Sequence, residues 1–169
     1  MSDYYGRYLM KAVSLAELEQ QYPQGFCQSL SMFGALSNES LQFLLQQGEL
    51  LSVQPGDRLF SIGDVSEQFY VIIKGGVRFY QHRPEDDVSV PMRLYAEGEQ
   101  IGFVGMIGLH ARRGDAVVEN EGYLLKISTE LFHRLCEQYP EMFMIFLINI
   151  TREMSREISH LDQMYADKN

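Results

Sequence analysis

The hydrophobic residues between Glu49 and Ser128 come in short runs that turn-forming residues separate. The separating segments read PGD, GD, GG, RPEDD, EGE and ENEG, which are compositions typical of tight turns. The runs themselves predict eight short strands, at residues 50–53, 58–60, 69–74, 76–82, 88–95, 100–104, 115–119 and 123–128. Eight strands at this spacing favour a jelly roll or barrel over a fold in which strands and helices alternate.

Helical patterns flank this strand-rich region on both sides. Ser14 and Ser37 each precede apolar positions of helical spacing and are expected N-caps, the first for a short helix at residues 15–21. A further helix is expected at residues 129–138, where a proline soon follows. We therefore predict a mainly β fold with flanking helices, of the cupin-like double-stranded β-helix (jelly roll) type.

The last part of the chain predicts one long helix, from Glu141 to about Ala166. Its apolar residues step by threes and fours along one face, at Phe143, Leu147, Ile150, Met154, Ile158 and Leu161. Such a helix would be roughly 37 Å long, which exceeds what a small barrel can cover. We expect a homodimer through this face, and the alternative is that the helix simply packs on its own barrel.

These elements divide the chain into three parts. Residues 1–30 form an N-terminal helical extension, residues 31–138 form the barrel with its entry and exit helices, and residues 139–169 form the long C-terminal helix. A length of 169 residues suits one domain with such extensions.

Charge and residue usage narrow the classes of partner. The net charge of −9 repels phosphate backbones, and the densest basic pair, Arg112-Arg113, makes no stripe, so nucleic acid is not expected as a direct partner. The cysteines Cys27 and Cys136 show no metal or disulfide spacing and suit a reducing cytoplasm. The histidines are scattered, and the longest apolar run is too short to cross a bilayer, so neither a metal site nor a membrane segment is expected.

Four segments carry a resemblance to a known family: Phe33-Gly34-Ala35-Leu36-Ser37, Pro55-Gly56-Asp57-Arg58-Leu59-Phe60, Gly75-Gly76-Val77 and Glu97-Gly98-Glu99-Gln100-Ile101-Gly102. In these the chain resembles the cyclic-nucleotide-binding domain of the catabolite activator family, which protein kinase A regulatory subunits also contain. The resemblance implies the same barrel and a non-enzymatic regulatory role. The DNA-binding helix-turn-helix of that family's transcription factors has no counterpart after the long helix, so direct DNA binding is not expected.

The resemblance also implies a phosphate-binding cassette that starts at Gly102. In the family, backbone amides and an arginine hold the cyclic phosphate, the residue after the arginine often adds a hydroxyl, and a glutamate after the glycine binds the ribose. Carried over, the glutamate position is Phe103, followed by Val104. The arginine falls on Arg113, with Arg112 one register away, and Gly114 stands where the hydroxyl would be.

These departures predict a changed pocket. We expect the ring of Phe103 to fill the space of the ribose, and Asp115 to place a negative charge near the anion. Two unmet polar groups and a repelling carboxylate would weaken cyclic AMP binding by roughly a thousandfold. Alternatively, Arg113 pairs with Asp115 or lies in solvent and binds no ligand.

The function that these features favour is a small-molecule-sensing regulatory module without enzymatic activity. A cyclic nucleotide stays a candidate ligand, beside another anionic or nucleotide-like effector, and the resemblance leaves haem or an aromatic effector open. The alternative is a degenerate, ligand-free domain that acts in dimerisation or binds a regulatory protein partner, with the pocket closed by Phe103. An enzyme is not expected, because no HxH pair, GxSxG or GxxxxGK sequence occurs.

Overall fold

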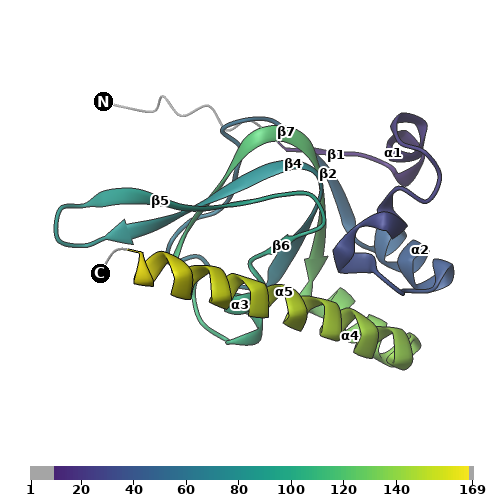
Figure 1. Ribbon diagram of the computed structural model, residues 1–169. Coiled ribbons are helices and arrows are strands. Elements are labelled where there is room, and N and C mark those ends of the chain that lie inside the picture. The colour runs from purple at the N-terminus through teal and green to yellow at the C-terminus, as the bar shows by residue number, and fades with distance from the viewer. Residues whose placement is uncertain (1–9, 168–169) are drawn as a thin grey trace.

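The computed structural model describes residues 10–167, which form one curled antiparallel sheet flanked by helices (Figure 1). Within these residues the sheet has seven strands: β1 (Lys11–Ala12), β2 (Glu49–Val53), β3 (Arg58–Phe60), β4 (Gln68–Arg83), β5 (Val88–Tyr95), β6 (Gln100–Ile101) and β7 (Gly114–Ser128). Their order is β1-β2-β7-β4-β5, with β3 also pairing with β7 and β6 with β4. The predicted mainly β jelly-roll class is confirmed.

Two of the strands are twice as long as the sequence predicts. β4 replaces the two expected strands at 69–74 and 76–82, and β7 replaces those at 115–119 and 123–128. The register between them shifts three times from Ile72 to Val77, so the glycines bend the strand without ending it. A Cβ at Gly122 would lie 2.0 Å from the Lys74 carbonyl oxygen, so the close approach of the two strands requires glycine there.

One predicted strand is too long and one strand was not predicted. The strand expected at 100–104 ends at Ile101, because the chain turns at Gly102 into the short helix α3 (Phe103–Ile107). The unpredicted strand β1 pairs with β2, so part of the predicted N-terminal extension joins the sheet. The first nine residues of that extension lie outside the described residues.

The predicted helices and their caps are confirmed. They are α1 (Leu15–Gln21), α2 (Asn38–Gln47), α4 (Thr129–Gln138) and α5 (Pro140–Ala166), with two short 3-10 helices η1 (Cys27–Ser29) and η2 (Ser31–Phe33). Ser14 makes a full capping box with Glu17, and Ser37 accepts a hydrogen bond from the Ser40 amide at 3.2 Å. At the start of α4 the cap is Ser128, which accepts a hydrogen bond from the Leu131 amide at 3.1 Å.

The alternation of side chains along β4 separates two apolar cores. Phe69, Val71 and Ile73 face the core that the helices cover, whereas Tyr70 and Ile72 face the interior of the barrel. Both faces of β4 are buried between Phe69 and Ile73, and in this part the strand is an unbroken apolar run.

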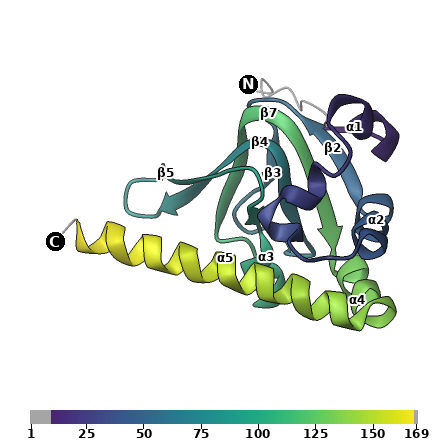
Figure 2. The same cartoon turned by 45° about the vertical axis from the view of Figure 1, so that its right-hand side comes forward.

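Helix α5 divides into a packed half and an outer half. In its first half Phe146 and Ile150 are completely buried, and the Asn149 side chain donates hydrogen bonds to the carbonyls of Met32 and Gly34. In the outer half Ile158 is 58% exposed and Leu161 is 42% exposed. Figures 1 and 2 show this half running past α3 towards the side of the molecule where the β5 hairpin projects.

The predicted apolar face of α5 therefore splits between two environments. Ile150 is buried, Phe143, Leu147 and Met154 are half-buried against the protein's own core, and only Ile158 and Leu161 are exposed. No helix within residues 10–167 is long and apolar enough to span a bilayer.

Candidate functional site

A cavity of about 480 Å³ lies between the barrel, α3 and the outer half of α5. Its volume falls in the range of small-molecule sites in proteins. Most of its wall is apolar, with side chains from the barrel and from α5: Phe60, Phe79, Met92, Ile101, Val104, Met154, Ile158 and Leu161. The polar side chains gather on two walls, which come from different parts of the chain.

The first wall, which we call the cassette wall, comprises Gly102, Val104, Gly105, Arg112 and Arg113. Arg112 is only 4% exposed, and its guanidinium group lies 4.1 Å from the centre of the Phe60 ring. Its Nη1 donates a hydrogen bond to the Gly102 carbonyl at 2.7 Å, and its Nη2 donates to the Gln68 carbonyl. Its Nε is buried without a hydrogen-bond partner.

Arg112 forms no salt bridge within the described residues. Its guanidinium group donates hydrogen bonds to carbonyls, and no carboxylate of residues 10–167 lies within salt-bridge distance of it, although the Asp64 carboxylate acts on it from further away. Burial accordingly lowers the pKa of this guanidinium group, although an arginine stays charged at neutral pH. A buried cation at the wall of a cavity favours an anion inside the cavity.

Gly102 is required at the start of the cassette for two reasons. Its φ of 99° lies in the left-handed region, and a Cβ on it would come within 2.8 Å of Arg112 Nη1. The glycine therefore lets the guanidinium group reach the backbone of the turn. Val104, the third residue of the predicted cassette, is 46% exposed and lines the cavity.

The structure corrects the register of the predicted arginine. The family resemblance placed this arginine at Arg113, with Arg112 one register away. In the structure the buried guanidinium group belongs to Arg112, and Arg113 is exposed at the rim of the cavity. The following strand explains this, because the buried residues in the first part of β7 are Gly114, Ala116 and Val118, which alternate in phase with Arg112. Gly114 pairs with Gln81 in the sheet, and a Cβ there would lie 2.3 Å from the Tyr80 carbonyl oxygen.

The predicted role of Phe103 is also wrong. Its side chain is 3% exposed and packs edge-on against Phe69 and Phe132 in the helix-covered core. It contributes nothing to the lining of the cavity. Phe103 therefore leaves the cavity without a carboxylate at this position but does not close it.

Asp115 does not approach the cavity either. Its carboxylate lies 3.2 Å from Arg58 Nη1 and accepts a hydrogen bond from the Ile62 amide at 2.9 Å. Its pairing with Arg113, which the sequence left open, is replaced by this contact with Arg58. The expected repulsion of an anion by Asp115 is thus screened by a cation on the outside of the barrel.

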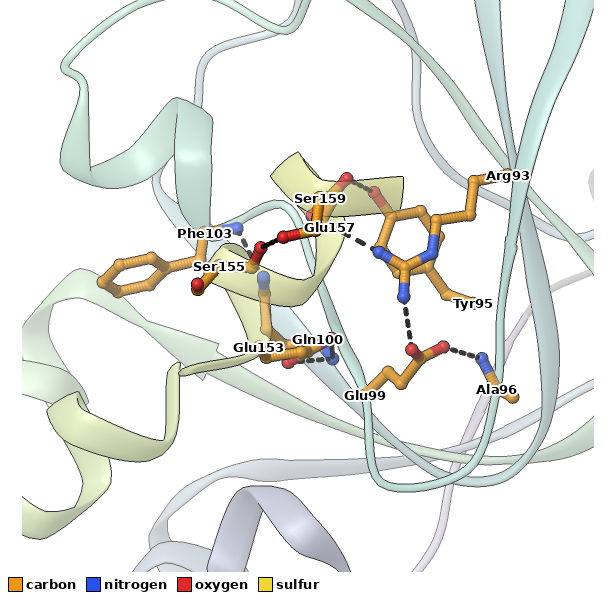
Figure 3. Close-up of polar contacts among 10 residues, drawn as sticks. All are labelled: Arg93, Tyr95, Ala96, Glu99, Gln100, Phe103, Glu153, Ser155, Glu157 and Ser159. Atoms are coloured by element: carbon orange, nitrogen blue, oxygen red, sulfur yellow. Dashed lines mark hydrogen bonds and ion pairs between the residues drawn. The ribbon is translucent and has the colours of Figure 1, made fainter. Parts of the chain in front are cut away.

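The second wall, which we call the helix wall, comprises Arg93 and Tyr95 of β5, Gln100 of β6, and Glu157 of α5. Arg93 forms ion pairs with Glu99 and, at 3.6 Å, with Glu157, and lies 4.6 Å from the centre of the Tyr95 ring (Figure 3). The Tyr95 hydroxyl donates to the Glu157 carboxylate. Burial, together with this hydrogen bond, raises the pKa of Tyr95, which keeps the hydroxyl a donor.

A second carboxylate of α5 connects the helix to the cassette. Glu153 is 3% exposed, and its carboxylate accepts the Gln100 amide hydrogen bond at 3.0 Å. The Gln100 side chain in turn accepts a hydrogen bond from the Phe103 amide at 3.2 Å, as Figure 3 shows. Burial raises the pKa of Glu153 to about 8. This chain of bonds couples the position of α5 to the first turn of α3.

The charged side chains that line the cavity are mainly positive. Arg93, Arg112 and Arg113 line it together with one carboxylate, that of Glu157, and with His110. This local excess stands against a net charge of −9 for the whole chain. The cavity therefore suits an anion better than the rest of the surface does.

Sequence reasoning missed the helix wall. Tyr95 and Glu157 lie 62 positions apart and belong to no common motif, so only the folded chain brings them together. A signal was available in the helix itself, because Glu153 and Glu157 are four residues apart and so share one face. For metals, no group of three or more candidate ligands comes together among the residues that the structure describes.

Comparisons with known proteins agree with this geometry. The family described as "Cyclic nucleotide-binding domain" matches residues 50–139, which is more than half of the chain. Among curated proteins, Lysophospholipase NTE1 of Chaetomium globosum is 29% identical over 111 residues. That match covers 66% of this chain but only 7% of the fungal protein, so the chain corresponds to a small part of it.

Solved structures show the same fold. A cyclic nucleotide-binding domain from Methylobacillus flagellatus KT superposes with a TM-score of 0.81 at 17% identity, covering 98% of this chain and 93% of that one. The catabolite activator protein of Thermus thermophilus gives 0.64 at 23% identity, covering 80% of this chain and 63% of that one. At these identities the likeness shows the fold alone.

Proposed function

The chain belongs to the cyclic nucleotide-binding domain family, and from this premise we propose that it is a regulatory module that senses an anionic small molecule without catalysing a reaction. The effector binds in the cavity between the cassette wall and the helix wall. The observation that carries the proposal is the buried guanidinium group of Arg112, which forms no salt bridge with any carboxylate within residues 10–167.

The energetic argument starts from the cost of this buried charge. A buried charge is costly unless another charge or several hydrogen bonds compensate for it. Arg112 has two carbonyl acceptors, and its buried Nε has none. An anion in the cavity supplies the missing countercharge, and charge-assisted hydrogen bonds of this kind are about twice as strong as neutral ones.

The cassette wall gives no support to a preference for ribose. In the family resemblance a glutamate after the glycine binds the ribose hydroxyl, but this position is Phe103, which faces the core. We therefore expect cyclic AMP to bind weakly, and the natural effector to be an anion that does not depend on a sugar contact at this point. The lost hydroxyl contact alone would cost about 1–3 kcal/mol.

Calorimetric titration with cyclic AMP, cyclic GMP and inorganic phosphate tests the proposal. We expect saturable but weak binding of at least one of these anions, and Arg112→Gln should lower its affinity by about tenfold or more. Arg113→Gln is the matched control, because it removes the same charge from the exposed rim and should change affinity by less than about threefold. Silence of all three anions at millimolar concentrations would favour the alternative, a ligand-free domain.

We further propose that the chain forms a homodimer through α5, which would relay binding to a regulatory protein partner. On the predicted face of α5, Ile158 is 58% exposed and Leu161 is 42% exposed. The proposed interface also uses Met144, at 63%, and Ile148, at 46%, which lie on a neighbouring face of the helix. Sedimentation equilibrium of the purified protein and of Ile148→Glu tests this. A wild-type protein that stays monomeric at micromolar concentrations would refute the dimer.

The same proposal includes a cytoplasmic location. Cys27 and Cys136 are both unpaired thiols in the structure, and unpaired thiols are typical of reducing compartments.

A further inference from the structure

The β5 side of the helix wall presents two hydrogen-bond donors to the cavity from one strand. Arg93 and Tyr95 are two positions apart, so both side chains stand on the same face of β5. The guanidinium group lies 4.6 Å from the centre of the tyrosine ring, so the two donors point into one corner. Arg93 Nη1 is buried there without a hydrogen-bond partner.

The group that occupies this corner is a carboxylate of the same chain. Glu157 accepts the hydrogen bond of the Tyr95 hydroxyl, but its other oxygen stays 3.6 Å from Arg93 Nη1. That distance makes an ion pair and is too long for a good hydrogen bond. Arg93 therefore has a donor that Glu157 attracts but does not satisfy, and a better-placed anion would gain a bond.

Glu157 also belongs to a weakly packed part of the molecule, the outer half of α5. The neighbouring Ile158 is 58% exposed and Leu161 is 42% exposed, although both border the cavity. Displacing the Glu157 carboxylate therefore requires little loss of apolar packing in the outer half of α5. By contrast, Arg93 and Tyr95 belong to strand β5, and Tyr95 pairs there with Val77 of β4.

We infer that Arg93 and Tyr95 form a second anion-binding subsite of the cavity, which the Glu157 carboxylate fills until an acidic group of the effector takes its place. The inference rests on the proposed function, since it concerns the same cavity. The effector class is then an organic anion with two acidic groups separated by an apolar body, one group at Arg112 and the other at Arg93. Its binding breaks the contacts of Glu157 with Tyr95 and Arg93, which join α5 to β5. Occupancy of the cavity thereby changes the position of α5 on the barrel.

Inorganic phosphate is the probe for this subsite, titrated calorimetrically at constant ionic strength. The wild-type protein is expected to bind one phosphate, at Arg112. Glu157→Gln should bind a second phosphate, and adding Arg93→Met to it should abolish the second one. Glu157→Ala vacates the same position and serves as the second variant if Glu157→Gln folds poorly.

The matched control is Glu99→Gln. Glu99 also pairs with Arg93, but it accepts the Ala96 amide hydrogen bond and lies outside the cavity lining, so its removal should create no phosphate site. The inference is overturned if Glu157→Gln and Glu157→Ala bind no more phosphate than the wild type, or if Glu99→Gln binds as much as they do. Failure of the proposed function gives a different result. In that case the wild-type protein binds no phosphate at all, and Arg112→Gln has no phosphate binding to remove.

Discussion

The cassette wall and the helix wall of one cavity differ in how their arginines are paired. Arg112 on the cassette wall is 4% exposed and donates only to carbonyls, whereas Arg93 on the helix wall is paired with two carboxylates, Glu99 and Glu157. A charge that the protein neutralises itself serves mainly to hold elements together. A charge that it leaves without a countercharge is available to a ligand.

The two walls also differ in which segments of the chain form them. The cassette wall comes from a single stretch between Gly102 and Arg113, and its geometry depends on a local turn. The helix wall joins β5, β6 and α5, so its hydrogen bonds and ion pairs depend on the position of α5 relative to the barrel. We infer that the first wall holds the effector, and that the second wall responds when an acidic group of the effector displaces Glu157 from Arg93 and Tyr95.

The largest expected effect concerns Glu153, which accepts the Gln100 amide hydrogen bond behind the helix wall. It tests whether the stability of the folded protein depends on pH through this residue. Burial raises the pKa of Glu153 to about 8 in the folded protein, whereas a glutamate in the unfolded chain has its ordinary pKa of about 4.5. Below pH 4.5 both states hold the proton and its contribution to stability is complete. Between pH 4.5 and 8 only the folded state holds it, so the free energy of unfolding falls by up to about 1.4 kcal/mol per pH unit.

Urea unfolding as a function of pH measures this slope. Glu153→Gln should flatten it between pH 4.5 and 8, because the side chain can no longer release a proton. Glu141→Gln, an exposed position on the same helix, is the control and should leave the slope unchanged. The charged groups that act on Glu153 are Arg93, Glu99 and Glu157, and parallel curves for wild type and Glu153→Gln would contradict the assignment of the slope to Glu153.

The next effect compares the two arginines directly. Arg93→Met leaves Glu99 and Glu157 without their cation and should lower the free energy of unfolding by about 3 kcal/mol. Arg112→Met removes a charge without a countercharge and leaves two carbonyls to find other donors, so it should cost only about 1 kcal/mol. Thermal and urea unfolding of both variants measures this, and an equal or larger cost for Arg112→Met would contradict the comparison of the two walls.

The smallest expected effect comes from the Tyr95 hydroxyl. Tyr95→Phe removes one hydrogen bond to Glu157 while Arg93 still faces that carboxylate, so the expected loss is about 1 kcal/mol of unfolding free energy. Tyr123→Phe, whose hydroxyl bonds to Gln21 in an exposed position, should cost less. If the two variants are equal in urea unfolding, the Tyr95–Glu157 bond does not stabilise the docking of α5.

Much of the fold follows from local information in the sequence. Ser14, Ser37 and Ser128 satisfy the free amides at the starts of their helices, and the structure shows each of these caps. The positive φ of Gly102 is a local backbone requirement, so the start of the cassette could also be predicted. The lengths of β4 and β7 could not, because a glycine in a bulge has the same local signal as a glycine in a turn.

The sequence by itself thus determined the mainly β class, the helix caps and the long helix α5, because each depends on patterns of residues that are close along the chain, and the family resemblance located the cassette. Only the tertiary structure decided that Arg112 faces the cavity, that Phe103 turns into the core and that Glu157 meets Arg93 and Tyr95. A one-residue change of register reverses the face of every side chain in a strand, and bonds between distant segments exist only once those segments are packed together.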